Sequence, residues 1–209
     1  RGEKGGRVAC WASKELVTPV RFAYSHASEH FWSWSKHHIG RIKLGFKSDG
    51  KLHAMDHDEY CESGSYGRAS VRSAARAGGM LQYNRNCQHM RIRTSHVATN
   101  RLKCRDYCGI GTAPGMYNVG QTMDMAAEAL GMDPIELMKM NTMQKGSFDA
   151  HWGAPMAYCD NDGHNESLDH CAAESGWATK WSGWDGIAKK TGVVKHGIGA
   201  CLKTHTGGS

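Results

Sequence analysis

The sequence predicts an α+β fold, with mixed sheets and flanking helices. Three observations predict it: an alternating β-hairpin at 39–60, a pair of capped helices at 116–138, and long irregular loops between regular elements. The glycine-rich, metalloprotease and hydrolase signatures GxGxxG, GxxxxGK[ST], HExxH and GxSxG do not occur. Spacing alone therefore indicates a fold class and no particular activity.

The chain begins with a predicted helix and a predicted strand. Residues 7–16 place Val, Trp, Ala and Leu side chains on one face of a short helix. This helix ends before Pro19, because the residue before a proline is restricted to extended conformations. Residues 20–24 alternate Val, Phe and Tyr with other residues, and we expect them to form a strand.

A hairpin is the clearest β signal. Residues 39–46 and 52–60 alternate apolar and polar side chains about a turn in which Asp-Gly at 49–50 supplies the positive φ. Residues 62–79, rich in Gly, Ser, Ala and Arg, are expected to form a loop, and a further strand is expected at 90–95. These segments supply the sheet of the predicted fold.

Residues 116–130 form the best helix. Val119, Met123 and Leu130 belong to one apolar stripe at helical spacing, and Gly131 stands where a left-handed cap belongs. A second helix follows at once, because Asp133 can cap it and Pro134 suits its first turn, with Glu136 completing a capping box.

The carboxyl-terminal part carries weaker signals. Residues 145–165 resemble a linker in composition, and Asn165 then caps a short helix that reaches Ser175 and ends at Gly176. Residues 193–204 are expected to form a closing strand. The chain starts without a Met or an apolar targeting segment, so we expect it to be an internal piece of something longer.

Composition excludes several classes of protein. The 209 residues carry 26 Lys plus Arg against 20 acidic residues, a net charge of +6, without a basic run that would indicate a nucleic-acid partner. Mean hydropathy is −0.57 and apolar stretches are short, which predicts no membrane span. The mild positive charge suits an acidic partner or a phosphate-bearing cofactor.

Cysteine and histidine are abundant but scattered. The eight Cys form no CxxC pair, which disfavours a zinc or cluster site and predicts reduced, mostly buried thiols in a cytoplasmic protein. His37 and His38, or His53 and His57, are the candidate metal ligands. We do not favour a site there, because strand alternation separates them or leaves them in solvent.

Several segments, in order and spacing, resemble the large, molybdenum-binding subunit of the xanthine oxidase family. The hairpin HHIGRIKLGFKSDGKLHAMDHDEY at 37–60 is similar to that family's hairpin segment. Thr99-Asn100 resembles the pair that precedes its conserved loop, which here is DYCGIGTAPG at 106–115. The helix pair MAAEALGMDPIELMKMN at 125–141 is a close match.

This resemblance implies a molybdopterin cofactor with molybdenum, expected in the cytosine dinucleotide form. The family transfers water-derived oxygen to a carbon of a small-molecule substrate, and electrons leave through iron–sulfur clusters and FAD on partner subunits. It also implies a division into three segments. Residues 1–145 are the latter part of a first molybdopterin-binding domain, residues 146–165 form a linker, and residues 166–209 start a second molybdopterin-binding domain. The family's glutamate base would lie beyond Ser209, in the remainder of the large subunit.

Two candidate catalytic residues follow from the resemblance. Arg76 falls where purine-oxidising members place an arginine that pairs with substrate oxygen. Cys108 stands in the loop over the metal, where the family has Arg. The cofactor-facing residues of that loop are Tyr107, Gly109, Ile110 and Gly111.

The loop also departs from the family pattern, which leaves alternatives open. Ile110 replaces the aromatic residue that stacks on planar substrates, and Pro114 replaces Gln. These changes fit a new substrate or a cofactor-free structural relative. Cys108 also fits a subunit similar to carbon monoxide dehydrogenase, in which a Cys of this loop bridges copper to molybdenum. An unrelated α+β binding domain is a further alternative.

Overall fold

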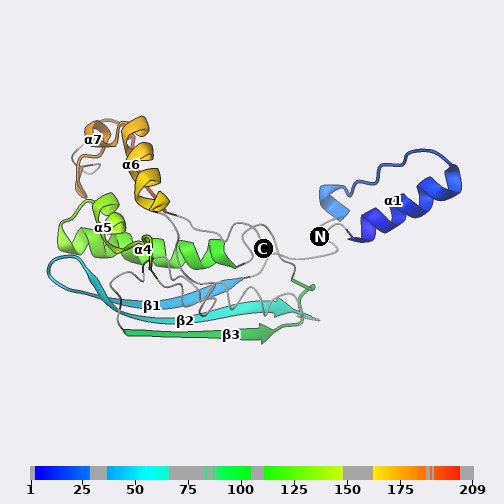
Figure 1. Cartoon of the computed structure of the whole chain (residues 1–209), viewed down its shortest axis with the longest axis horizontal. Coiled ribbons are helices and arrows are strands. Elements are labelled where there is room, and N and C mark those ends of the chain that lie inside the picture. The colour runs from blue at the N-terminus through cyan, green and yellow to red at the C-terminus, as the bar shows by residue number, and fades with distance from the viewer. Residues whose placement is uncertain are drawn as a thin grey trace.

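The computed structural model describes residues 3–28, 37–65, 83, 87, 89–104, 111–147, 162–186, 189 and 191–202. Its elements are α1 (Glu3–Leu16), β1 (His38–Phe46), β2 (Leu52–Gly64), β3 (His89–Ala98), α4 (Thr112–Leu130), α5 (Pro134–Asn141), α6 (Gly163–Ser175) and α7 (Trp177–Lys180). The three strands form one sheet in the order β1–β2–β3, and α4 lies along it (Figure 1). The α+β prediction is confirmed.

The predicted hairpin is confirmed as β1 and β2. The strands are antiparallel with Ile42 opposite His57, and Gly50 turns the chain at a φ of +85°. β2 continues to Gly64, so the prediction of a loop from residue 62 is wrong for 62–64. The backbone N–H of Glu62 donates to the carbonyl of His37 at 2.9 Å, which extends the ladder. Residues 66–79 lie outside the described residues.

β3 contains the strand predicted at 90–95 and runs parallel to β2. Side chains alternate between two faces of the sheet. On the outer face, Asp56 pairs with Arg91 and Asp58 pairs with Arg93. The inner face, which α4 covers, changes from apolar near the hairpin turn to polar toward the other end. We call this other end, where His38, Cys61 and Gly64 lie, the distal end of the sheet.

α4 confirms the predicted apolar stripe and its carboxyl-terminal cap. Val119, Met123 and Ala127 are buried against the sheet, and Gly131 adopts a φ of +67°. The helix begins at Thr112, four residues before the predicted start. Gly111 caps the helix at a φ of +84°, a left-handed conformation that glycine adopts without strain, and the helix begins at the next residue.

α5 begins as predicted at an Asp cap. Asp133 Oδ1 accepts a hydrogen bond from the Ile135 N–H at 2.8 Å, with Pro134 in the first turn. The capping box is wrong, because the carboxylate of Glu136 lies 3.3 Å from Lys139 Nζ instead. One capping bond therefore starts this helix.

The carboxyl-terminal helices pack against α5 and the end of α4. α6 begins at Gly163 after Asp162, so its cap lies three residues before the predicted cap Asn165, and it ends at Gly176 as predicted, with a φ of +70°. Trp177 Nε1 donates to Asp133 Oδ2 at 2.8 Å, and Trp184 Nε1 donates to the Met132 carbonyl at 2.9 Å. These bonds join residues on both sides of the predicted linker. The domain division at 146–165 stays a prediction.

Two predicted strands are absent from the structure. Residues 20–24 and 194–202 have no regular secondary structure, because no neighbouring strand in the described ranges supplies a hydrogen-bonded partner. Residues 203 and 204 lie outside those ranges. Phe22 and Tyr24 instead pack edge to face with ring centroids 4.9 Å apart.

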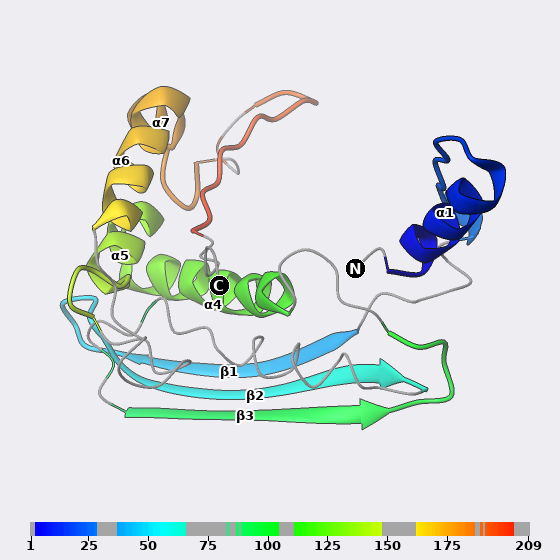
Figure 2. The ribbon, with the colours of Figure 1, turned by 45° about the vertical axis from the view of Figure 1, so that its right-hand side comes forward.

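α1 confirms the predicted first helix but starts earlier, at Glu3. In both views it lies away from the sheet (Figures 1 and 2). Its expected apolar face is exposed in large part, with Trp11 and Leu16 each 65% exposed.

Candidate functional site

The structure describes one of the six predicted site residues, Gly111. It is the residue from which α4 starts, at a positive φ that glycine adopts without strain, and its role toward the cofactor stays a prediction. Arg76, Tyr107, Cys108, Gly109 and Ile110 lie outside the described residues. Their roles stay predictions.

The two described residues that flank the predicted loop are held at the distal end of the sheet. On one side, the Cys104 N–H donates to the Ser63 carbonyl at 3.0 Å. On the other side, α4 runs above the sheet toward the hairpin turn, so it begins on the side of the distal end (Figure 2). Cys104 and Gly111, the described residues on either side of 105–110, therefore both lie toward the distal end.

Gly64 allows the chain to close tightly at this end. A Cβ on Gly64 would lie 2.9 Å from the Leu102 carbonyl carbon and 3.2 Å from the Arg101 oxygen, and its φ is +64°. Ser63 Oγ donates to the Val97 carbonyl at 3.1 Å, which ties β2 to the end of β3. A larger residue at 64 would push the 101–104 segment away from the sheet.

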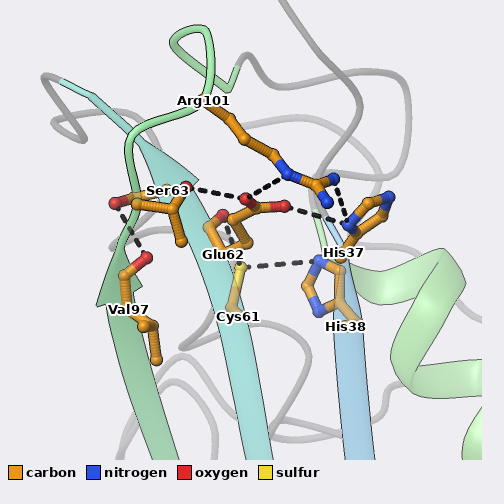
Figure 3. A network of polar contacts seen from close by, with 8 residues as sticks. His37, His38, Cys61, Glu62, Ser63, Val97 and Arg101 are labelled. Carbon is orange, nitrogen blue, oxygen red and sulfur yellow. Dashed lines mark hydrogen bonds and ion pairs between the residues drawn. The ribbon is translucent and has the colours of Figure 1, made fainter.

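Glu62 gathers three polar side chains at the distal end (Figure 3). Thr99 Oγ1 donates to Glu62 Oε1 at 2.7 Å, and Arg101 Nε lies 3.5 Å from the same oxygen. His37 Nδ1 lies 3.0 Å from Glu62 Oε2. Arg101 is a permanent donor and lies 3.1 Å from His37 Nδ1, so that nitrogen acts as an acceptor. Glu62 Oε2 consequently receives no hydrogen bond, although it is buried.

A second polar group lies deeper, on the inner face. Glu59 is 1% exposed, and its carboxylate contacts His38 Nδ1 at 2.7 Å and His57 Nε2 at 3.1 Å. Burial raises the pKa of Glu59, but hydrogen bonds with the two histidines outweigh it and leave the pKa below its usual value. The carboxylate is therefore ionised at neutral pH.

His38 connects this buried carboxylate to a cysteine. Its Nε2 lies 3.5 Å from Cys61 Sγ, directly across the β1–β2 ladder (Figure 3). His57 is fully buried, which corrects the expectation for that residue, whereas His37 and His38 are separated as expected, with side chains 57% and 3% exposed. No group of three or more metal-binding side chains comes together within the residues that the structure describes.

Sequence reasoning missed Glu59 and Glu62 as members of a site, and it weighed His38 only as a metal ligand beside His37. A signal was present, because His57, Glu59 and Cys61 alternate along one strand and must share a face. Placing His38 beside them also required the register of the hairpin. The outcome illustrates that polar residues on an alternating strand can be buried when a helix covers that face.

A separate cavity of about 180 Å³ lies between α4 and the segment at 200–201. Met116, Met123 and Tyr83 line it together with Asp124. Burial raises the pKa of the Asp124 carboxyl. The cavity is smaller than the roughly 300–1,000 Å³ of typical ligand sites, so we do not assign the cofactor to it.

Comparison with known proteins decides the family. The model of the family described as "Molybdopterin cofactor-binding domain" matches residues 6–142, more than half of the chain. The chain belongs to this family. The predicted resemblance to the molybdenum hydroxylases is therefore confirmed.

Relatives of this molybdopterin-binding domain are oxidoreductases. The chain is 29% identical over 133 residues to an aldehyde oxidoreductase of Megalodesulfovibrio gigas, covering 61% of the chain and 14% of the relative. It is 25% identical over 223 residues to the nicotinate hydroxylase hnxS of Emericella nidulans, covering 95% and 16%. The chain thus spans about 15% of the length of such relatives.

A solved structure agrees with the fold. The aldehyde oxidoreductase from Desulfovibrio desulfuricans superimposes with a TM-score of 0.65 at 20% identity, covering 81% of this chain and 18% of that one. None of the helices in the described part of this molybdopterin-binding domain has the length and apolar character to cross a bilayer.

The described residues of the domain suit a molybdopterin at the distal end. α4 starts after Gly111 without a side-chain cap, so the backbone N–H groups of Thr112 and Ala113 and the positive end of its dipole are available to a phosphate group. No acidic side chain stands in its first turn to compete. The start of α4 is therefore the described part of the chain that could hold the cofactor.

Proposed function

We propose that this chain forms part of the cofactor-binding site of a molybdenum hydroxylase, and that the loop at 106–111 contacts the cofactor. The observation that carries the proposal is that both flanks of this loop are held at one end of the sheet in a molybdopterin-binding domain. A loop anchored on both sides presents its backbone in one place. Such an arrangement suits the binding of a large planar cofactor.

When bound, the molybdopterin, in its cytosine dinucleotide form, supplies the exchange of two electrons and the transfer of water-derived oxygen to a substrate carbon. Iron–sulfur and FAD subunits are the proposed partners that take the electrons. The remainder of the large subunit completes the site, and the cytoplasm is the proposed location. The substrate is a small molecule.

The proposed roles of individual residues follow their chemistry. The Arg76 guanidinium pairs with a substrate oxygen and stabilises negative charge that develops there. Gly109 and Gly111 let the backbone approach the cofactor, and Tyr107 and Ile110 flank that approach. The thiol of Cys108 lies beside the metal.

Two alternative functions would explain the same loop residues. A cofactor-free structural relative would explain the changes at Cys108, Ile110 and Pro114 as loss of catalysis. A subunit similar to carbon monoxide dehydrogenase would use Cys108 as a ligand for copper. Metal content separates all three.

The test is elemental analysis of the native complex, followed by a cysteine variant. We expect about one molybdenum or tungsten per complex, with iron. Absence of molybdenum and tungsten would favour the cofactor-free relative, and copper beside molybdenum would favour the carbon monoxide dehydrogenase type.

For the variant, we expect Cys108→Ala to abolish or alter turnover while the thermal midpoint stays nearly constant. Cys10→Ala is the matched control, because Cys10 is an exposed thiol on α1. A turnover rate equal to that of the unsubstituted complex would remove Cys108 from the site.

A further inference from the structure

The buried carboxylate of Glu59 has a third partner, which comes from α4. Asn118 Nδ2 donates to Glu59 Oε2 at 3.2 Å. Together with His38 from β1 and His57 from β2, Asn118 gives the carboxylate donors from three elements. A buried ion is tolerated only with such donors, so the fold depends on keeping these elements together.

Gly40 makes this contact possible. A Cβ on Gly40 would lie 2.9 Å from both Asn118 Cγ and Glu59 Oε2, and it would clash with Asn118 Nδ2. The φ of Gly40 is not in the left-handed region, so glycine is needed here for space and not for backbone conformation. Asn118 passes over Gly40 to reach the carboxylate.

The bond fixes a degree of freedom that apolar packing leaves open. The other buried contacts of α4 come mainly from Val119, Met123 and Ala127, and such contacts have little directional preference. A hydrogen bond at a single position of the helix defines its rotation and its translation along the sheet. Asn118 lies seven residues after Gly111, which is about 10 Å along the helix.

The geometry points to Glu59 and Asn118 as positioning residues, which hold the start of α4 and therefore the Gly111 end of the cofactor loop in place. This inference rests on the proposed function. The other flank of the loop is held independently, by the bond from Cys104 to Ser63. Loss of the Asn118 contact therefore releases one flank only.

Two variants of the full chain, and a third as their control, test the contact with the helix. Gly40→Ala displaces Asn118, and Asn118→Ala removes the donor without adding bulk. Gly45→Ala is the matched control on the same strand, because its Cβ would lie 3.6 Å from the Ala54 Cβ, an ordinary contact. Amide hydrogen exchange is measured along α4.

We expect the amides at 115–119 to exchange on the order of tenfold faster in Gly40→Ala and Asn118→Ala, while those at 126–130 keep their rates. Gly45→Ala should leave both groups of amides unchanged. Unchanged exchange at 115–119 in Asn118→Ala, or equal acceleration along the whole helix, would overturn the inference.

Molybdenum content of the complex tests the connection to the loop. Gly40→Ala and Asn118→Ala should lower the molybdenum bound per complex, and Gly45→Ala should retain it. Full retention in all variants would show that Glu59 does not position the loop. Absence of molybdenum and tungsten from the unsubstituted complex would overturn the proposed function. The difference in amide exchange between 115–119 and 126–130 decides by itself whether Glu59 holds the helix.

Discussion

At the scale of single residues, the inner face of β2 shows how burial changes the role of polar side chains. Glu59 is ionised although it is buried, because His38 and His57 donate to it from both sides. Glu62, at the distal end, relies on Thr99 and on a half-exposed Arg101. The deeper carboxylate therefore depends more strongly on its partners.

A prediction on pH follows for Glu59. Because its pKa in the folded chain lies below the usual value, the ionised carboxylate contributes stability that is present above the unfolded pKa of about 4.3. This stability is lost as the pH falls through the folded pKa. We expect urea midpoints of the full chain to fall more steeply below about pH 5 than those of Glu59→Gln.

The matched control for this prediction is Glu128→Gln, which removes an exposed carboxylate from α4. It should keep the pH profile of the unsubstituted chain. Identical profiles for Glu59→Gln and the unsubstituted chain would contradict the ionised state that we assign to Glu59.

At the scale of elements, Gly120 within α4 and Gly131, which caps the helix, have opposite roles. Gly131 ends the helix at a φ of +67°, with nothing within 4 Å of the place that a Cβ would occupy. Gly120 lies inside the helix, where, among the described residues, its Cβ would meet Cys201 Sγ alone, at 3.8 Å. Neither position lacks room for a Cβ, so the two glycines differ in backbone conformation.

We expect alanine at these two positions to change the free energy of unfolding in opposite directions. Gly131→Ala should lower it by about 1 kcal/mol, because alanine is strained in the left-handed region. Gly120→Ala should raise it by about 0.5–1 kcal/mol, because alanine is favoured within helices. Urea unfolding of both variants measures the difference, and changes of the same sign would contradict the assignment.

At the scale of the whole molecule, Asn141 joins the helices to the hairpin across about 90 residues of sequence. Its Oδ1 accepts from the Leu52 N–H at 2.8 Å, and its Nδ2 donates to the Gly50 carbonyl at 2.9 Å and the Leu137 carbonyl at 3.0 Å. The side chain is fully buried. The end of α5 is thus tied to the hairpin turn.

Asn141→Leu should lower the free energy of unfolding by about 2–4 kcal/mol, because it leaves buried backbone groups at Gly50 and Leu52 without partners. Met138→Leu, a buried substitution of similar volume on the same helix, should change it by less than about 1.5 kcal/mol. Urea unfolding of the full chain compares the two. Equal effects would show that packing, and not the hydrogen bonds, accounts for the role of Asn141.

Local signals predicted most of the regular elements. The turn at Gly50 and the caps at Asp133, Gly131 and Gly176 depend on the backbone preferences of one or two residues, so they are visible in the sequence. The strands expected at 20–24 and 193–204 were wrong, because a strand also needs a neighbour to pair with.

The candidate site also has a part that the sequence predicted and a part that it could not predict. The resemblance predicted the family and the loop at 106–115, and the family is confirmed. The contact between Glu59 and Asn118 could not be predicted, because it joins residues 59 positions apart through a space that only Gly40 leaves open.

The sequence by itself determined the hairpin, the helix pair and the family of this protein, since each depends on short patterns of neighbouring residues. Only the tertiary structure decided which polar residues are buried together and how the start of α4 is held at the distal end. The physical reason is that hydrogen bonds to a buried carboxylate depend on the register of strands and the rotation of a helix, which no local pattern specifies.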